Sequence, residues 1–574
     1  TLRYSITGGA DAAKFAINAT TGALTFRAAP DFEVPGDAES QRLYDELLRR
    51  FTRRGAELDA ADKSRLQEIN QRLSELSERF GRNLLTDTKA LAVAFEREEL
   101  AGLSEDQLAA YEQDGRYVVP IELPTTQALQ AELEVSASRH KLFDASRARG
   151  RESNRDIVLE SVRLRQERAK LLGFDTHADY VIAEETAGTA AAARQLIADL
   201  APAAAANAEA ERKLAGELAG QELGGADWPY WQAKRREEEL GIDEAELRKY
   251  FPLEQVLTDG VFYAANLLYG ITVEKRGDLA GYRDDVDVWE VKEEDGTGIG
   301  LLLTDYNARP SKRGGAWMSS FVDQSHLAGT KPVVVNVMSV NSNLLTIDEV
   351  TTVFHEFGHA LHGLLSDVRY PSHSGTNVPR DWVEFPSQIN ENYAFAPEIA
   401  RNYARHVDTG EVIPRPLLEA LEASRQFGQG FSTAEYLAAS AIDLAWHSLD
   451  DEIPSDISAF EESVLRQYGL DVDGLEPRYR STWFNHIFAG GYSAGYYSYL
   501  WAEALDADGY QLVAEEGINR ATGAKFREAI LSKGASRDYA EAYRAFRGRD
   551  KDTRPLLQRR GLAGTATDEP SPVQ

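Results

Sequence analysis

Helical periodicity runs through most of the chain from about residue 40 onward. The segment RLYDELLRRFTRRGAEL, followed by DAADKSRLQEINQRLSELSERFGRNLL, carries apolar residues at spacings of three and four. This spacing places apolar side chains on one face of a helix, so neighbouring helices can bury those faces against each other. We therefore expect a mainly α fold built as a helical bundle. Similar patterns occur at 103–113, 125–172, 190–222, 243–270 and 346–548.

Strand-like patterns interrupt the helical ones shortly before residue 346. The segment VDVWEVKEEDGTGIGLLLTDY (286–306) reads as two strands joined at Asp295-Gly296, a dipeptide typical of tight hairpins. The segment KPVVVNVMSV (331–340) is rich in β-branched residues and indicates a further strand. The sequence thus predicts a small β-element inside the helical fold.

Residues 1–36 differ from the rest of the chain. They alternate apolar and polar residues and break at Gly, Thr-Gly and Pro, which predicts short strands. FAINATTGAL resembles part of a cadherin-type repeat, and Asp31-Phe32-Glu33 is similar to its calcium-binding motif. We favour a β-segment without a working calcium site. The predicted organisation is a β-rich segment, a catalytic domain and a disordered tail, at 1–36, 37–563 and 564–574.

Composition excludes several classes of function. The 574 residues include no cysteine, so disulfides, thiolate metal sites and cysteine nucleophiles are excluded. The formal net charge of −30 disfavours binding to nucleic acid or anionic membranes. No run of eighteen apolar residues and no signal-peptide pattern is present. We expect a cytoplasmic protein, with secretion or a periplasmic location as open alternatives.

The segment TTVFHEFGHALHGLL (351–365) carries the strongest chemical signal. His355 and His359 lie four residues apart in an apolar pattern, so both rings face the same side of a helix. Neutral imidazoles at this spacing can fill two corners of a tetrahedral zinc site. Glu356 projects beside the same point, where it can accept a proton from water activated by the metal. The apolar flanks favour a metal site over a solvated helix face that happens to carry two histidines.

A catalytic zinc site needs a third protein ligand. Leu365 occupies the position, six residues after His359, where a metzincin-type site carries histidine, so that class is excluded. The next helical pattern, 379–395, offers Glu384 and Glu391, which lie seven residues apart on one helix face. One of them could ligate the metal while the other supports a histidine. Periodicity leaves both assignments open.

Several motifs together resemble the thimet-oligopeptidase (M3) family of zinc peptidases, and most closely its bacterial peptidyl-dipeptidase branch. They are HEFGHALHGL with SGTNVPRDWVEFPSQINENYA, then GGAWMSSFVD, WFNHIFAGGYSAGYYSYLW and the ending FREAILSKGASRDYAEAYRAFRGR. The resemblance covers about 41–562 and implies two helical lobes, a deep substrate channel and a β-element near the zinc. Members usually carry a further helical segment before the point matching residue 41. Cadherin-like strands stand in its place here, which leaves three alternatives: a truncated chain, a fusion or a mis-assembled gene.

The resemblance also implies roles for individual residues. Glu384 becomes the third ligand of one zinc ion per chain, and Glu391 either supports a ligand histidine or is a solvated carboxylate. His486, Tyr492 and Tyr499 face the substrate from a mobile glycine-rich loop. A phenol such as that of Tyr499 can donate to the oxyanion that develops during hydrolysis.

Other residues of these segments are expected to be structural. His362 lies on the HExxH helix, but no ligand position remains for it. Tyr496 and Tyr497 are expected to pack in the core.

The predicted activity is hydrolysis of short unstructured peptides by a monomeric zinc peptidase that releases dipeptides from free C-termini. Such release requires cations or donors for the terminal carboxylate. Arg380, Arg478 and Arg480 lie in suggestive segments, but salt bridges suit them equally, so none is assigned. The alternative within the class is an internally cutting oligopeptidase. The alternative from another class is a calcium-dependent surface or secreted interaction protein with an inactive peptidase domain.

Overall fold

The computed structural model describes residues 15–17, 24–26, 37–241, 243–309, 312, 315–340, 342–450 and 452–562. The chain divides into two compact units, Thr1–Ala56 and Glu57–Gln574. In the first unit, β1 (Phe15–Ile17) pairs antiparallel with β2 (Leu24–Phe26), and helix α1 (Ala38–Arg53) follows. The two strands agree with the predicted β-segment. The Asp31-Phe32-Glu33 motif and the tail 564–574 lie outside the described residues, so both predictions stay predictions.

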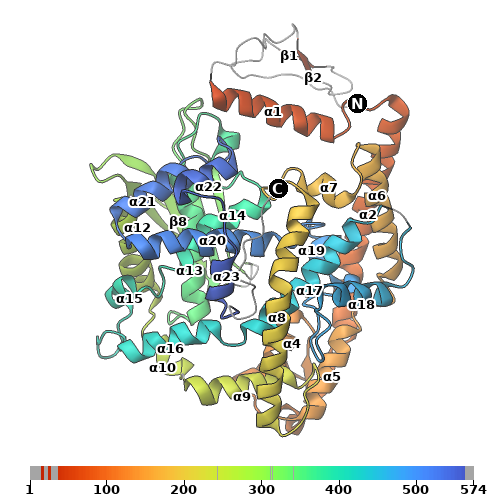
Figure 1. Cartoon of the computed structure of the whole chain (residues 1–574). Coiled ribbons are helices and arrows are strands. Elements are labelled where there is room, and N and C mark those ends of the chain that lie inside the picture. Colours follow the sequence, from red (N-terminus) through yellow and green to blue (C-terminus); the bar gives the residue numbers. More distant parts are fainter. Residues whose placement is uncertain are drawn as a thin grey trace. The chain divides into compact units, whose positions relative to one another are not determined.

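The second unit is built mainly from helices, which confirms the mainly α prediction (Figure 1). The helices before the central sheet are α2 (Ala60–Ala90), α3 (Glu105–Tyr111), α4 (Leu123–Glu132), α5 (Ser136–Arg147), α6 (Arg155–Leu171), α7 (His177–Ile182), α8 (Ala190–Ala219), α9 (Trp228–Leu240), α10 (Glu244–Arg248), α11 (Leu253–Gln255) and α12 (Tyr263–Tyr269). Those after it are α13 (Ile347–Leu364), α14 (Arg380–Glu391), α15 (Pro397–Tyr403), α16 (Arg415–Gln426), α17 (Gln429–His447), α18 (Ile457–Tyr468), α19 (Asn485–Phe488), α20 (Ser498–Glu516), α21 (Arg520–Phe526), α22 (Tyr539–Arg547) and α23 (Arg554–Arg559).

The central sheet contains the strands expected from the sequence and two more. The predicted hairpin is β7 (Asp287–Lys292) with β8 (Gly298–Asn307), and the predicted third strand is β10 (Val333–Val340). The short strands β6 (Thr272–Lys275) and β9 (Trp317–Val322) extend the sheet to the order β6-β7-β8-β10-β9. Only the pairing of β8 with β10 is parallel. Helix α13 follows β10 in the chain and packs against it.

A second, three-stranded sheet was not predicted: one of its strands overlaps the end of the predicted helical range 103–113, and the other two fall between predicted helical ranges. It joins β3 (Val93–Phe95), β5 (Arg116–Val119) and β4 (Glu112–Gln113). Asp114 and Gly115 form the connection between β4 and β5, both with positive φ angles, of 49° and 80°. That Asp-Gly pair is a hairpin signal. The strands are so short that helical periodicity on either side outweighed it.

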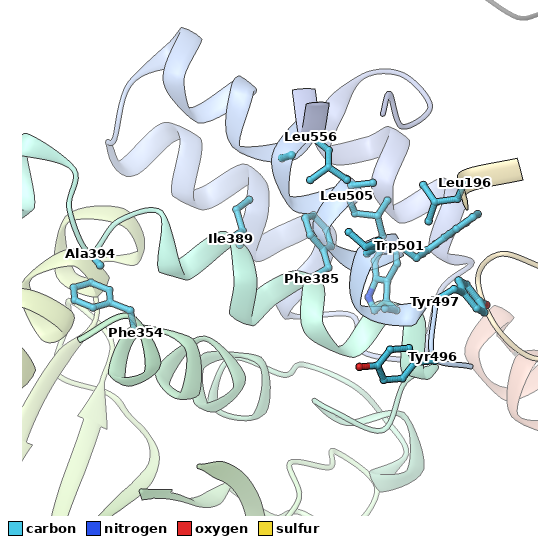
Figure 2. Packing of buried hydrophobic residues seen from close by; sticks show 14 of the residues in the cluster. Leu196, Phe354, Phe385, Ile389, Ala394, Tyr496, Tyr497, Trp501, Leu505 and Leu556 are labelled. Carbon is cyan, nitrogen blue, oxygen red and sulfur yellow. The ribbon is translucent and has the colours of Figure 1, made fainter. Parts of the chain in front are cut away.

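Helix α14 lies between α13 and α20 and packs on both. Phe385 and Ile389 of α14 are almost fully buried, and Figure 2 shows them among the same group of apolar side chains as Leu505 of α20 and Leu556 of α23. Phe354 of α13 is also buried, and it lies next to the C-terminal end of α14. Truncating a buried phenylalanine costs about 3–5 kcal/mol. The core therefore fixes α14 relative to its two neighbours.

Within the described residues, no helix is long and apolar enough to cross a membrane.

Candidate metal centre and active site

Helix α13 carries the two histidines and begins at a capping box. The Thr346 hydroxyl accepts from the backbone N–H of Glu349 at 3.0 Å, and the Glu349 carboxylate accepts from the backbone N–H of Thr346 at 2.8 Å. These bonds satisfy donors that the start of a helix leaves unpaired. The apolar face of the helix is buried and includes Val350, Val353, Phe354 and Phe357. This burial fixes the rotation of α13 about its axis and thus the direction of its histidines.

Gly358 allows α13 and α14 to approach closely. A Cβ atom at this position would lie 2.7 Å from both the Pro386 carbonyl oxygen and the Ser387 Cα. Both contacts involve backbone, so a larger residue would push the two helices apart. This role of Gly358 was not predicted from the sequence, although an isolated glycine in a helical pattern can indicate such a contact.

The close approach places Glu384 of α14 against both histidines. Glu384 Oε2 lies 3.2 Å from His355 Nε2 and 3.2 Å from His359 Nε2. The donor atoms of the three residues lie within 4.8 Å of one another, and no other such group of His, Asp and Glu occurs in the described part of the chain. The Ser387 hydroxyl donates to Glu384 Oε2 at 3.0 Å and helps to orient the carboxylate.

The electrostatics of this group favour a positive charge at its centre. Burial would raise the pKa of Glu384, but hydrogen bonds from His355 and His359 outweigh burial and hold this pKa well below its usual range. Burial would likewise lower the pKa of His355, yet Glu384 and Glu391 raise it well above the ordinary value. The carboxylates thus stabilise a cation bound between the histidines.

Glu391, one of the two glutamates left open by periodicity, lies on the other side of the His355 ring. The Nδ1 of His355 is 2.7 Å from Glu391 Oε1, so its N–H donates to the carboxylate and Nε2 is left facing Glu384. The neighbouring Asn390 donates to the Phe354 carbonyl at 2.6 Å and so joins the two helices at this level. This arrangement is the one in which a carboxylate orients a histidine ligand.

Glu356 and His362 are both buried on α13 but differ in their surroundings. Glu356 is 4% exposed, and its Oε2 has no hydrogen-bond partner among the described residues. Burial raises the pKa of the Glu356 carboxyl. His362 is fully buried, and burial together with His359 lowers its pKa to about 3. His362 is therefore a neutral core residue. The Glu356 carboxyl, in contrast, has a pKa that also responds to the charges of His355, His359 and Glu384.

The tyrosine-rich segment brings its predicted residues together. The rings of Tyr492 and Tyr499 are nearly parallel, with centroids 5.8 Å apart, and His486 lies 6.0 Å from Tyr492. Burial, Tyr492 and the charge of Glu384 raise the pKa of Tyr499, so its phenol keeps its proton near Glu384. Burial and Arg478 lower the pKa of His486, which keeps that imidazole neutral.

Tyr496 and Tyr497 are buried beside this group, as expected for packing residues. Figure 2 shows both near Trp501 in the buried apolar cluster. Tyr496 stacks on Tyr436, with centroids 4.9 Å apart, and the Tyr497 hydroxyl donates to Asp381 at 3.1 Å.

Asp443 of α17 anchors the loop that carries these tyrosines. Its carboxylate accepts from the backbone N–H groups of Ala494 at 2.8 Å and Tyr496 at 2.9 Å. Ala494 has a φ of +54°, a conformation that L-residues with a side chain rarely adopt. The two bonds therefore hold a strained backbone in place. Asp443 was not singled out from the sequence, although an acid inside the apolar pattern ASAIDLAWH requires partners when buried.

Comparisons with known proteins place the chain among peptidases. The model of "Peptidase family M3" matches residues 129–562. The chain is 41% identical to the dipeptidyl carboxypeptidase of Salmonella typhimurium and 40% identical to that of Escherichia coli, in each case over 92% of this chain and 81% of the relative. It is 33% identical to oligopeptidase A of Salmonella typhimurium, over 91% of this chain and 82% of the relative. On this evidence, and with the HExxH helix and its glutamate partner in place, the chain belongs to peptidase family M3.

Proposed function

We propose that this protein is a zinc-dependent peptidase that releases dipeptides from the free C-termini of short, unstructured peptides. The zinc-binding part of this proposal rests on one observation: two imidazole nitrogens each lie 3.2 Å from the same oxygen of Glu384. Peptide hydrolysis is the activity of the family. The preference for C-terminal dipeptides rests on the relatives named dipeptidyl carboxypeptidase, which are more similar to this chain than oligopeptidase A.

The residues present fit a zinc ion. Nitrogen and oxygen ligands at about 2.0–2.1 Å from a tetrahedral zinc lie about 3.3 Å from one another. The separations of 3.2 Å between Glu384 Oε2 and each histidine Nε2 agree with that value. Glu391 fixes the tautomer of His355 that leaves Nε2 free to bind. When bound, zinc would polarise the scissile carbonyl and acidify a water molecule.

Glu356 is the proposed general base. It lies one residue beyond His355 on the same helix, and its Oε2 has no partner among the described residues. That oxygen can accept a proton from the attacking water and then pass it to the leaving amine. Burial raises the pKa of this carboxyl above its ordinary value, which makes it a stronger base for the proton of the water.

Tyr499, Tyr492 and His486 are the proposed groups that contact the reacting peptide. The raised pKa of Tyr499 keeps a phenol proton available for donation to the developing oxyanion. Tyr492 lies nearly parallel to Tyr499, with ring centroids 5.8 Å apart, so both phenols can face the same peptide. The neutral His486 can donate to, or accept from, the substrate backbone.

Three further expectations stay proposals of the same kind: a monomeric state, a cytoplasmic location and a channel that admits only unfolded peptides. The relatives named oligopeptidase A support a second candidate, internal cleavage of short peptides, at 33% identity.

Mass spectrometry of a synthetic decapeptide tests the proposed function. The decapeptide is prepared with a free C-terminal carboxylate or as its amide, and is incubated with the protein before and after removal of zinc by a chelator. We expect the acid to shorten by two residues at a time, the amide to stay intact, and both chelation and Glu356→Gln to stop the reaction. Because Glu356 is not a proposed ligand, the variant should keep its zinc.

A single internal cut in both peptides would replace dipeptide release with the oligopeptidase alternative. Hydrolysis that persists in the zinc-free protein would contradict the metal part. An intact acid peptide with zinc-loaded, folded protein would contradict the enzyme itself and favour an inactive peptidase domain.

A further inference from the structure

Three arginines lie in the segments around the site, and the structure separates their roles. Arg480 is held by two carboxylates, Glu461 at 2.9 Å and Glu476 at 2.8 Å. The guanidinium of Arg478 lies 3.5 Å from Glu435. Arg480 is thus committed to structural ion pairs, and Arg478 already faces an acid.

Arg380 differs from both. Its guanidinium carbon lies 4.2 Å from the centre of the Tyr492 ring, and no carboxylate of the described residues forms a salt bridge with it. Glu185 interacts with Arg380 electrostatically, while its own carboxylate accepts from the backbone N–H of Asp381 at 3.3 Å. The Arg380 side chain is only partly buried, so its free N–H groups can meet an anion that arrives from solvent.

Gly495 leaves room for this side chain. A Cβ atom at Gly495 would lie 3.0 Å from Arg380 Nη1, which is tighter than ordinary contact. The tip of Arg380 is therefore seated between the ring of Tyr492 and the backbone at Gly495. Packing on a rigid ring reduces the entropy that an arginine loses when it binds a carboxylate.

The position of Arg380 on α14 sets its distance from the reacting atoms. Arg380 and Glu384 are four residues apart, so they share a helix face and are separated by about 6 Å along the axis. In an extended peptide, two residues span about 7 Å. The terminal carboxylate of a substrate lies two residues beyond the bond whose cleavage releases a dipeptide. With the scissile carbonyl beside Glu384, that carboxylate is within reach of the Arg380 side chain.

We propose that Arg380 binds the C-terminal carboxylate of the substrate and thereby sets the length of the released product at two residues. This inference rests on the proposed function. An arginine suits the role because its planar guanidinium donates two parallel hydrogen bonds to a carboxylate. If one or three residues lay between the scissile bond and the C-terminus, a carboxylate bound to Arg380 would leave the scissile bond out of position beside Glu384.

The test compares each variant on the same peptide as free acid and as C-terminal amide, and reports the ratio of the two kcat/KM values. Arg380→Gln should lower the acid-to-amide ratio about 10- to 100-fold, the value of a charged hydrogen bond expressed as a rate ratio. Arg380→Lys keeps the charge without the paired donors and should give an intermediate ratio. The matched control is Arg480→Gln, which makes the same substitution on a neighbouring arginine and should keep the wild-type ratio. Arg478→Gln is measured in parallel as the competing candidate for the same role.

Gly495→Ala gives an independent variant in which Arg380 itself is intact. The added methyl group should displace the guanidinium tip and reduce the ratio less than Arg380→Gln does. This variant keeps the inference testable if Arg380→Gln fails to fold.

The outcomes distinguish a failure of the Arg380 anchor, meaning the proposed binding of the terminal carboxylate by Arg380, from a failure of the proposed function. A wild-type acid-to-amide ratio in a folded, zinc-loaded Arg380→Gln protein would overturn the anchor. A fall in this ratio seen only in Arg478→Gln would also overturn it. A wild-type enzyme that cleaves acid and amide equally would refute dipeptide release itself, and the anchor with it.

Discussion

The substitution Gly358→Ala tests whether helix spacing builds the metal centre. Alanine favours a helix interior over glycine by about 1 kcal/mol, so local propensity alone would stabilise the protein. The new Cβ, however, would lie 2.7 Å from the backbone at Pro386 and Ser387, where ordinary contact begins at 3.4 Å. The helices must therefore separate by about 0.7 Å, and such overpacking typically costs about 1–3 kcal/mol.

The same separation acts on the donor atoms. Glu384 Oε2 is 3.2 Å from each histidine Nε2, close to the edge of a zinc tetrahedron. If these distances grow by most of the 0.7 Å, the three donor atoms lie too far apart to bind one zinc ion at normal bond lengths. We therefore expect zinc affinity to fall about 10- to 100-fold. Competition with a chromophoric chelator measures the affinity, and denaturant unfolding of the zinc-free protein measures stability.

Gly363→Ala is the matched control. It makes the same substitution in the same helix, but its Cβ would meet side chains and not the backbone of α14. These are Met318 Cε at 2.7 Å, the far end of a flexible side chain, and Val334 Cγ1 at 3.0 Å, both on strands of the central sheet. We expect zinc affinity to stay at the wild-type value in this variant. Wild-type zinc affinity in a folded Gly358→Ala protein would refute the argument that close packing of α13 and α14 sets the ligand geometry.

Three further predictions concern single side chains. Tyr499→Phe should lower kcat about 100-fold with little change in KM, because an oxyanion donor acts mainly in the transition state; an unchanged kcat would remove Tyr499 from that role. Glu391→Gln should weaken zinc binding about 10-fold, because the amide holds His355 less firmly than the carboxylate at 2.7 Å; unchanged affinity would show that Glu391 is dispensable. Burial, opposed by Arg478 and Gln127, raises the pKa of Glu435 to about 7, from 4.5, so the folded state holds a proton that the unfolded chain releases in that range. Through this group, the free energy of unfolding should therefore fall by up to about 3 kcal/mol as the pH rises from 4.5 to 7. Denaturant titrations at several pH values should show that Glu435→Gln removes this part of the pH dependence. Parallel pH profiles of stability in the two proteins would contradict the prediction.

The sequence was most informative where chemistry is local. The HExxH pattern needs only one helix turn to place His355, Glu356 and His359 together, so spacing alone indicated the site. Strands β7 and β8 were indicated by the Asp-Gly turn between them, and β10 by its β-branched residues, whereas β6 and β9 were not predicted. Periodicity also put Glu384 and Glu391 on one face, but could not distinguish them, because the choice depends on which side of His355 each approaches.

What could not be derived from the sequence depends on contacts between distant segments. Gly358 matters because the backbone of α14 passes beside it, and Asp443 because the loop at Ala494 folds back onto α17. Arg380 could not be ranked above Arg478 and Arg480 until their ion pairs were visible. In each case the sequence gives the type of residue, but the partner that it contacts is known only from the structure.

The central claim, that His355, His359 and Glu384 form one metal site, is tested most directly by counting bound metal. Purified wild-type protein and the variants His359→Gln and Glu384→Gln are dialysed against dilute zinc, and metal per chain is measured by plasma mass spectrometry alongside thermal unfolding. We expect one zinc per wild-type chain, and loss of most of that zinc in both folded variants. A full equivalent of zinc retained in both variants would place the metal elsewhere and contradict a site formed by these three residues.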